Sequence, residues 1–456
     1  VNESAPYQSW TRSRSEFQKA YSQYLKDKGL NTIDPAKLQG EGFYRFLREI
    51  NIDFVRRATR FLRDEINYQG LITHLNHRQH LLNCDIREEL DFVDNHNYWD
   101  HPNFLPGKNW GFPRLHNQMS AICAGAWNPR TLMPSRIFGK PFTVTEYNFT
   151  FPNRYRAEGG PLFGGYAAFQ DWDGLYRFAW WSHMRETRLH EAPINGFDIA
   201  EDSNAHLSER LIWALFLRGD VSSGREAVAW PYGESVLKNW KSLDDTVYPV
   251  DFQKLGFNAK IGSLRENSSL PGVQLLKNPH EFTRELTPRL RALYKSAPAV
   301  SDTGEIFYGD RQFRIITPKT ESLALFNGNA GGHVLQVRNA DSFQVISAIS
   351  MDEKPLAQSK KILIFHQSDV VNQYLRYSSE TENAVESWGI NKPLIRKAKS
   401  TVILTLPSSD YKGYAIGLDG LPKSQISLTN QNGQLCFTAD TAAHHGTMIY
   451  LVQREP

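Results

Sequence analysis

The clearest periodic pattern in the chain predicts a long amphipathic helix that begins near residue 43. Apolar residues recur every three to four positions, at Phe43, Leu47, Ile50, Phe54, Ala58 and Phe61. Arginines fill the opposite face, at Arg45, Arg48, Arg56, Arg57 and Arg63. This spacing is typical of a helix that packs one side against a core. The helix is expected to end near Gly70.

From residue 43 to residue 181, helical patterns alternate with short apolar runs. The runs predict strands at 71–75, 90–94, 142–145 and 175–181, and further helices are expected at 159–172, 207–217 and 279–294. Alternation of this kind implies a parallel sheet or a barrel. Polar and aromatic residues follow the end of each expected strand, and in a barrel those ends converge on one pocket. The fold expected for this part is an α/β fold of the (β/α)₈ TIM barrel type.

Beyond residue 300 the sequence pattern changes to short runs in which apolar and polar residues alternate. Turn signals such as Gly309-Asp310 separate several of them. Such a series predicts an antiparallel, immunoglobulin-like β-sandwich. We therefore expect two domains: residues 1–296, the barrel part with a helical extension, and residues 297–456, an accessory sandwich.

The composition excludes some partners. The chain has 52 basic and 49 acidic residues and a net charge of +3, which gives no electrostatic footprint for nucleic acid. The sequence contains no run of about 18 apolar residues, so no membrane span is predicted. The cysteines Cys84, Cys123 and Cys436 have no spacing typical of a disulfide framework or a zinc site. Aromatic residues make up 12% of the chain, which suits stacking on sugar rings and ordinary core packing alike.

The stretch 140–156 carries the first candidate for chemistry. Its run 142–145 is rich in β-branched and aromatic residues and ends on the carboxylate of Glu146. Aromatic, amide and arginine residues follow, including Asn148 and Asn153. A carboxylate at the end of a buried strand is a usual position for the chemistry of barrel enzymes. The alternative is a solvated glutamate at the end of an ordinary strand.

A second acid, Glu3, follows Asn2 where Val1-Asn2-Glu3 has the pattern of a strand end. Retaining cleavage of a glycosidic bond needs two carboxyl groups about 5–5.5 Å apart. One attacks the anomeric carbon, and the other protonates the leaving oxygen and then activates water. Glu3 and Glu146 form a candidate pair for these roles, and a solvated acid near a chain end is the alternative for Glu3.

The ordered set Asn2-Glu3, His96-Asn97-Tyr98, Glu146 and Trp180 resembles the retaining glycoside hydrolases of clan A, and within them the cellulase-like family five group. The resemblance implies that these residues close barrel strands four, six, seven and eight. It implies the following roles: Glu3 as acid/base, Glu146 as nucleophile, Asn2 as a ligand of the sugar 2-hydroxyl, His96 and Tyr98 as positioning residues, and Trp180 or Trp181 as the ring under the sugar. Asn76, at the expected end of the 71–75 strand, is a further substrate-binding candidate, with a turn residue as the alternative.

On this resemblance only strands four to eight of the barrel are expected in this chain. Half a barrel leaves an open sheet edge. We therefore expect a fragment of a longer product, or a second chain that supplies the missing N-terminal half of the barrel. A wrong strand count is the remaining alternative.

Other chemistries find less support in the sequence. His74, His77 and His80 recur every three residues, but a strand that runs into a loop does not keep them on one face. The chain has no Gly-x-Ser-x-Gly elbow and no glycine-rich phosphate loop. No metal and no cofactor are expected.

The sequence thus predicts a retaining β-glycoside hydrolase that cleaves β-linked oligo- or polysaccharides. The alternative is a non-catalytic carbohydrate-binding or structural protein on the same scaffold. The expected partner is a β-linked glycan, with no nucleic acid and no membrane. By analogy with enzymes of this domain order, an extracellular or periplasmic location is expected.

Overall fold

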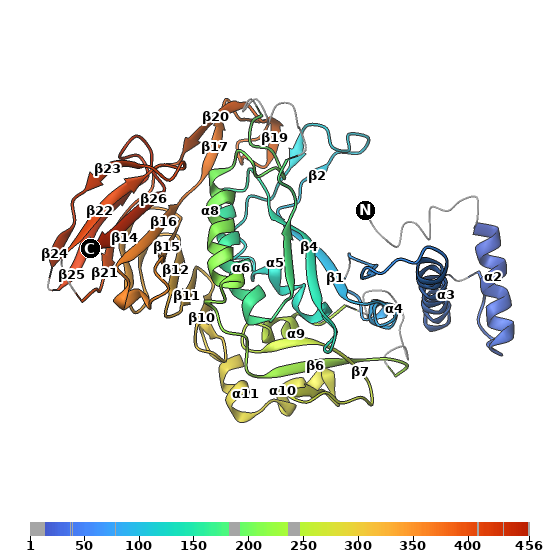
Figure 1. Ribbon diagram of the computed structural model, residues 1–456. Coiled ribbons are helices and arrows are strands. Elements are labelled where there is room, and N and C mark those ends of the chain that lie inside the picture. The colour runs from blue at the N-terminus through green and yellow to red at the C-terminus, as the bar shows by residue number, and fades with distance from the viewer. Residues whose placement is uncertain are drawn as a thin grey trace.

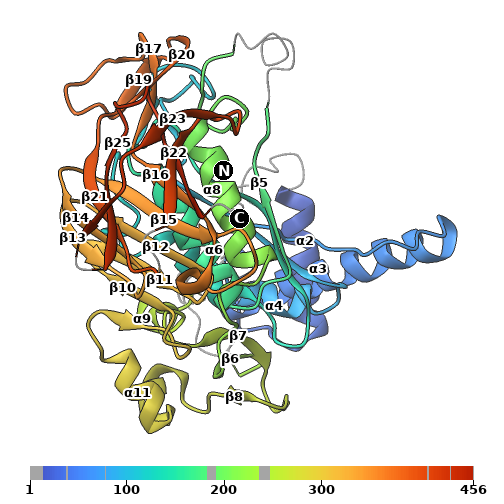
Figure 2. The same ribbon diagram turned by 60° about the vertical axis from the view of Figure 1, so that its left-hand side comes forward.

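The computed structural model describes residues 14–36, 38, 40–77, 79–181, 192–235, 247–407, 410–431 and 433–454. Two adjacent helices, α6 (Gly159–Phe169) and α8 (Ser203–Ile212), lie between a small parallel sheet and a large antiparallel sheet (Figures 1 and 2). The other α-helices in these ranges are α2 (Arg14–Asp27), α3 (Glu41–Arg60), α4 (Leu82–Arg87), α5 (Trp127–Arg130), α9 (Val250–Leu255), α10 (Phe282–Glu285) and α11 (Pro288–Tyr294).

Helix α3 is the amphipathic helix that the sequence predicts. Its buried side chains include Phe43, Phe46 and Leu47. They pack against α2, where the rings of Phe17 and Phe46 are 5.3 Å apart. Phe54 and Phe61 lie on the predicted apolar face but are exposed, so the buried stripe is shorter than the sequence pattern indicates.

The parallel strands lie in two small sheets. In the first, β4 (Phe142–Phe149) lies between β1 (Val93–Trp99) and β5 (Gly174–Arg177). In the second, β6 (Ala227–Tyr232) lies between β7 (Lys260–Arg265) and β8 (Val273–Leu275). A single parallel bridge from Ile137 to Ser263 connects the β4 region with the second sheet.

The predicted (β/α)₈ barrel, with its strands four to eight, is therefore wrong. Among the described residues the parallel strands lie only in three-stranded sheets, and most strands are antiparallel. One physical reason lies at residues 71–75, where the sequence predicts a strand next to β1. This segment makes isolated contacts, such as Thr73 Oγ1 donating to Phe92 O at 2.8 Å, and joins no sheet. Its residues are exposed or half-buried, so no core face holds them in register.

Within the described ranges, the antiparallel strands form four sheets. Nine strands make the largest sheet, in the order β23 (Pro422–Ile426), β22 (Tyr411–Ile416), β26 (Ile449–Arg454), β16 (Lys361–Gln367), β15 (Gln344–Ser350), β12 (Thr320–Leu325), β11 (Gln312–Ile316), β10 (Ile306–Gly309) and β9 (Ala299–Val300). Five make the next, in the order β13 (Gly328–Gly331), β14 (Leu335–Ala340), β21 (Lys399–Leu404), β25 (Gln434–Asp440) and β24 (Thr429–Gln431). The small sheets are β17 (Val370–Gln373) with β20 (Ile390–Ile395), and β18 (Arg376–Tyr377), β19 (Ala384–Ser387), β3 (Arg114–Leu115) and β2 (Asn103–Phe104).

Strands β12 and β15 of the nine-stranded sheet are buried on both faces, and this makes the immunoglobulin-like sandwich a wrong prediction as well. On β12, Leu323 and Leu325 belong to the hydrophobic cluster shared with the five-stranded sheet, whereas Ala324 belongs to the cluster shared with the helices. Every residue of β12 and β15 is buried. An immunoglobulin sandwich instead buries one face of each sheet and leaves the other to solvent.

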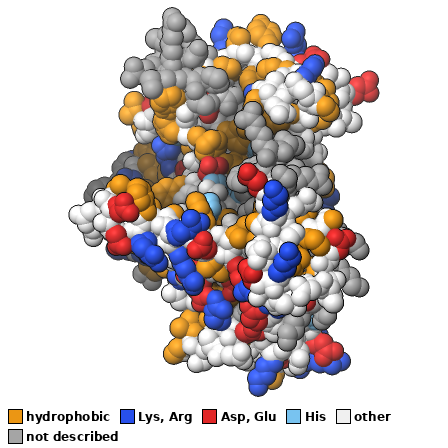
Figure 3. Space-filling view, turned by 90° about the vertical axis from the view of Figure 1, so that its right-hand side faces the viewer, with side chains coloured by type: hydrophobic (Ala, Val, Ile, Leu, Met, Phe, Trp, Pro, Cys, Tyr) orange, Lys and Arg blue, Asp and Glu red, His pale blue; other side chains and the backbone are white. Residues whose placement is uncertain are grey.

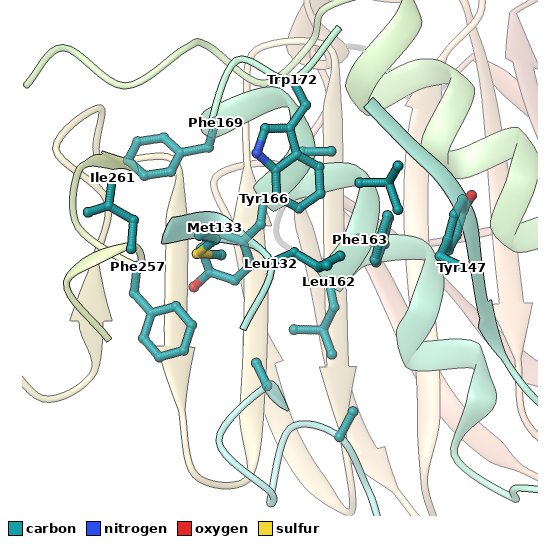
Figure 4. Packing of buried hydrophobic residues seen from close by; sticks show 14 of the residues in the cluster. Leu132, Met133, Tyr147, Leu162, Phe163, Tyr166, Phe169, Trp172, Phe257 and Ile261 are labelled. Carbon is teal, nitrogen blue, oxygen red and sulfur yellow. The ribbon is translucent and has the colours of Figure 1, made fainter. Parts of the chain in front are cut away.

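The main core lies around α6, which is buried almost all round. Figure 4 shows Phe163 of α6 near Trp172 and Tyr147, and the rings of Phe163 and Tyr147 stack at 4.0 Å. Glycines let α6 approach α8 closely: a Cβ at Gly164 would lie 3.0 Å from the Cα of Ile212. The stack of Phe163 on Tyr147 holds α6 against β4 and so covers one face of the β1–β4–β5 sheet.

Two helices predicted from the sequence are shaped differently. The pattern at 207–217 belongs to α8 and its continuation as a π-helix from Trp213 to Leu217. The pattern at 279–294 is divided into a 3₁₀ turn (Pro279–Glu281), α10 and α11. Thr287 is extended because it directly precedes Pro288, and the residue before a proline disfavours helical geometry.

The carboxyl group of Glu158 is fully buried at the start of α6. Its hydrogen-bond partners are the hydroxyl of Ser120 at 2.5 Å and the backbone N–H of Ile122 at 3.1 Å, with no cation against it among the described residues. Burial raises the pKa of Glu158 to about 8, although these hydrogen bonds act in the opposite direction.

We expect Glu158 to make the protein less stable as the pH rises. Between about pH 4.5 and pH 8 the unfolded chain loses this proton while the native state keeps it, so the free energy of unfolding falls by up to about 1.4 kcal/mol per unit of pKa difference. Glu158→Gln removes this dependence. Denaturant midpoints should show the variant gaining stability over the wild type from pH 5 to pH 8.5. An equal difference at both pH values would contradict the prediction.

Candidate active site

Glu146 lies inside β4, three residues before the strand ends, and its position is set by two irregularities in the sheet. The β1–β4 register places His96 opposite Glu146 after a shift between Asp94 and His96. The β4–β5 register shifts between Val144 and Tyr147. Val144 and Tyr147 both point into the core, so the usual alternation of side chains along the strand is broken. Thr145 and Glu146, which lie between them, both face away from the core.

Tyr98 holds the Glu146 carboxylate, and His96 lies beside it. The hydroxyl of Tyr98 donates to Glu146 Oε2 at 2.5 Å, and Nδ1 of His96 lies 3.4 Å from the same oxygen. The Glu146 side chain is 36% exposed, whereas His96 is buried. One carboxylate oxygen is thus fixed by the protein, while the group as a whole remains accessible.

A second acid, Asp94, sets the orientation of His96. Thr145 Oγ1 donates its single proton to Asp94 Oδ2 at 2.5 Å, and Nε2 of His96 lies 2.7 Å from the same hydroxyl oxygen. Because that proton is already used, His96 must carry its own on Nε2. Nδ1 then faces Glu146.

The ionisation of these neighbours agrees with their contacts. Burial, reinforced by the hydrogen bond to Glu146, raises the pKa of Tyr98, so the phenol keeps its proton and donates through the physiological range. Burial alone would raise the pKa of Asp94, but hydrogen bonds from His96, Thr145 and Thr143 lower it overall. Asp94 is therefore a buried anion that fixes the hydroxyl of Thr145.

The other predicted site residues are Asn2, Glu3, Asn76, Trp180 and Trp181. Asn2 and Glu3 lie outside the described residues. Asn76 is exposed in an irregular segment. Trp180 is 55% exposed and contacts His206, with the ring centroids 5.4 Å apart, and Trp181 is half-buried. In the described part of the chain, the hydrogen bond to the Glu146 side chain comes from Tyr98 and from none of Asn76, Trp180 and Trp181.

Several polar residues after Glu146 brace the fold instead of lining a site. Asn148 is buried, and its amide donates to the carbonyls of Phe178 and Phe197. Asn153 is buried as well and donates to Asp100 Oδ2 at 2.9 Å. These bonds hold the segment after β5 and the segment near Phe197 beside Tyr98.

Sequence reasoning missed four residues near Glu146. Asp94 and Thr145 orient His96, and Phe178 and Phe197 pack edge-on against the ring of Tyr98, with centroids 6.3 and 5.4 Å away. Asp94 lies two residues before His96, a spacing that places both on one face of a strand and could have indicated the pair. No local signal links Phe197 to Tyr98.

Figure 3 shows the face of the molecule opposite the large sheet. A hollow near its centre contains acidic and histidine side chains, and hydrophobic side chains gather around it. No group of three or more metal-ligating side chains occurs within the described ranges. No helix in these ranges is long and apolar enough to cross a bilayer.

Comparison with known proteins adds no relative: no family model, no curated protein and no solved structure matches the chain.

Proposed function

We propose that this protein is a retaining β-glycoside hydrolase that cleaves β-linked oligo- or polysaccharides, with Glu146 as its nucleophile. One observation carries the proposal: a partly exposed carboxylate accepts a 2.5 Å hydrogen bond from Tyr98 and lies against the Nδ1 of His96. A nucleophile needs one oxygen held in place and the group open to substrate. The exposed ring of Phe178, which packs edge-on against Tyr98, offers a flat apolar surface for the C–H face of a sugar.

The chemistry follows from this geometry. Both contacts fall on Oε2, so we assign the attack to Oε1 of Glu146. Oε1 bonds to the anomeric carbon as the bond from that carbon to the leaving oxygen breaks. The leaving oxygen keeps the electrons of the broken bond and receives a proton from a general acid. Water then attacks the same carbon, the acid residue accepts a proton, and the Glu146 carboxylate is regenerated.

The residue resemblance assigns the acid role to Glu3, which lies outside the described residues. The assignment to Glu146 does not depend on it, because nucleophile and acid are separate groups with separate tests. Tyr98 has the further role of reducing the charge on Oε2 in the free enzyme and releasing its hydrogen bond as the ester forms.

The test is covalent trapping in the full-length protein. A 2-deoxy-2-fluoro-β-glycoside with a dinitrophenyl leaving group slows release of the glycosyl-enzyme, so the protein should gain the mass of one fluoroglycosyl unit. We expect one member of a gluco, manno and xylo panel to label the peptide that contains Glu146. Labelling of another carboxylate, or hydrolysis without any label, would overturn the assignment. A protein that binds glycans without cleaving them would gain no mass.

A further inference from the structure

An unbroken series of aromatic rings leads from Tyr98 to the surface at Trp110. Phe197 is the central ring, 5.4 Å from Tyr98 and 5.9 Å from Trp110 between centroids. His101 makes a parallel link, 5.4 Å from Tyr98 and 6.2 Å from Trp110. Trp110 itself is 58% exposed. The series therefore starts at the partner of Glu146 and ends on an open indole ring.

Trp110 is held rigidly although it is exposed. Its carbonyl accepts a hydrogen bond from Arg114 at 2.8 Å, and Phe104 packs 5.0 Å from its ring. The segment that carries it is closed by pairing of β2 with β3, and Asp100 accepts from the backbone N–H groups of Asn117 and Gln118. An exposed tryptophan on a braced hairpin offers a flat surface without an ordering cost on binding.

A polar group accompanies this surface. Nδ1 of His101 lies 2.9 Å from the carbonyl of Pro102, which accepts its proton, so the neutral ring has its acceptor at Nε2. Burial lowers the pKa of His101 and keeps the ring neutral near pH 7. An indole ring for the C–H face of a sugar and an acceptor for a hydroxyl are the two groups that a sugar-binding subsite requires.

We propose that Trp110 and His101 form a distal subsite that holds a further sugar unit of the β-linked chain whose scissile bond lies at Glu146. The inference rests on the proposed function, which places the scissile bond at Glu146. Its test measures binding and does not depend on cleavage. Such a subsite is expected to give the protein a preference for long chains over a disaccharide.

The experiment measures binding by calorimetry in the Glu146→Gln background, so that it does not depend on turnover. The probes are cellohexaose, mannohexaose and xylohexaose, each compared with its disaccharide. We expect Trp110→Ala to weaken binding of the preferred hexasaccharide about tenfold and to leave the disaccharide unchanged. Trp110→Phe keeps a flat ring and should restore most of the affinity. Trp213→Ala is the matched control, because Trp213 is 48% exposed and packs against Arg218, away from this series.

Three results would overturn the subsite. They are unchanged hexasaccharide affinity in Trp110→Ala, an equal loss for the disaccharide, and no binding of any hexasaccharide by the parent. Failure of the proposed function gives a different pattern. In that case covalent trapping fails, while the length-dependent loss in Trp110→Ala still marks this surface as glycan-binding.

Discussion

Replacement of Glu146 by glutamine is expected to lower kcat on the preferred β-glycan by about 10³-fold or more, as removal of a covalent nucleophile does. Glutamine keeps the size of the side chain and can still accept the hydrogen bond from Tyr98, so the fold should persist. It cannot form the ester with the anomeric carbon. The measurement is the initial rate of reducing-end release by the full-length protein.

Glu209→Gln is the matched control, because its side chain is 35% exposed against 36% for Glu146 and also accepts from a tyrosine, Tyr147. It should retain activity within about twofold. Tyr98→Phe should give an intermediate loss of about tenfold, since it removes one hydrogen bond to Oε2 without removing the carboxylate. Activity of Glu146→Gln within tenfold of wild type on every β-glycan that the wild type cleaves would refute its role as nucleophile.

The neighbours of Glu146 could be predicted because they depend on local pattern and parallel pairing. The run 142–145 belongs to β4, and His96 and Tyr98 lie in the strand beside it. Side chains two residues apart share a face of a strand, so His96 and Tyr98 reach the same carboxylate. The position of Glu146 inside the strand was not predictable, because the register shifts beside Asp94 and Val144 arise from pairing between strands.

The prediction of the fold class was wrong for a different reason: an alternating pattern of helices and strands does not determine which strands pair. Residues 71–75 have the apolar run of a strand, yet they join no sheet. In the antiparallel part, the run at β15 fits a strand of the predicted sandwich, but its residues belong to two different hydrophobic clusters. A strand buried on both faces lies between two packed layers, which a pattern with one buried face does not indicate.

Arg156→Met is expected to cost about 3–5 kcal/mol of the free energy of unfolding, the scale for one charge removed from a buried ion pair. Arg156 is 1% exposed and donates to both oxygens of Asp202 at 2.7 and 3.0 Å, and to Asp369 at 2.8 Å. Asp202 caps α8, and Asp369 lies between β16 and β17. Methionine fills the space but leaves the buried Asp202 without its paired cation and Asp369 with Arg396 alone, and denaturant unfolding at pH 7 measures the loss.

The pH dependence of that loss distinguishes uncompensated charge from poor packing. Burial alone would raise the pKa of Asp202, but Arg156 more than offsets this, so the pKa in the native wild type is lowered. The resulting stabilisation is present above about pH 4 and is lost as the pH falls further. Without Arg156 the carboxyl group of Asp202 becomes protonated more readily, so the deficit of the variant should shrink towards pH 4. Arg154→Met, which removes a partly exposed partner of Glu382, should cost less than about 1 kcal/mol. Equal losses in the two variants, or a deficit of Arg156→Met that is independent of pH, would show that the Arg156 charge does not join α8 to the antiparallel sheet.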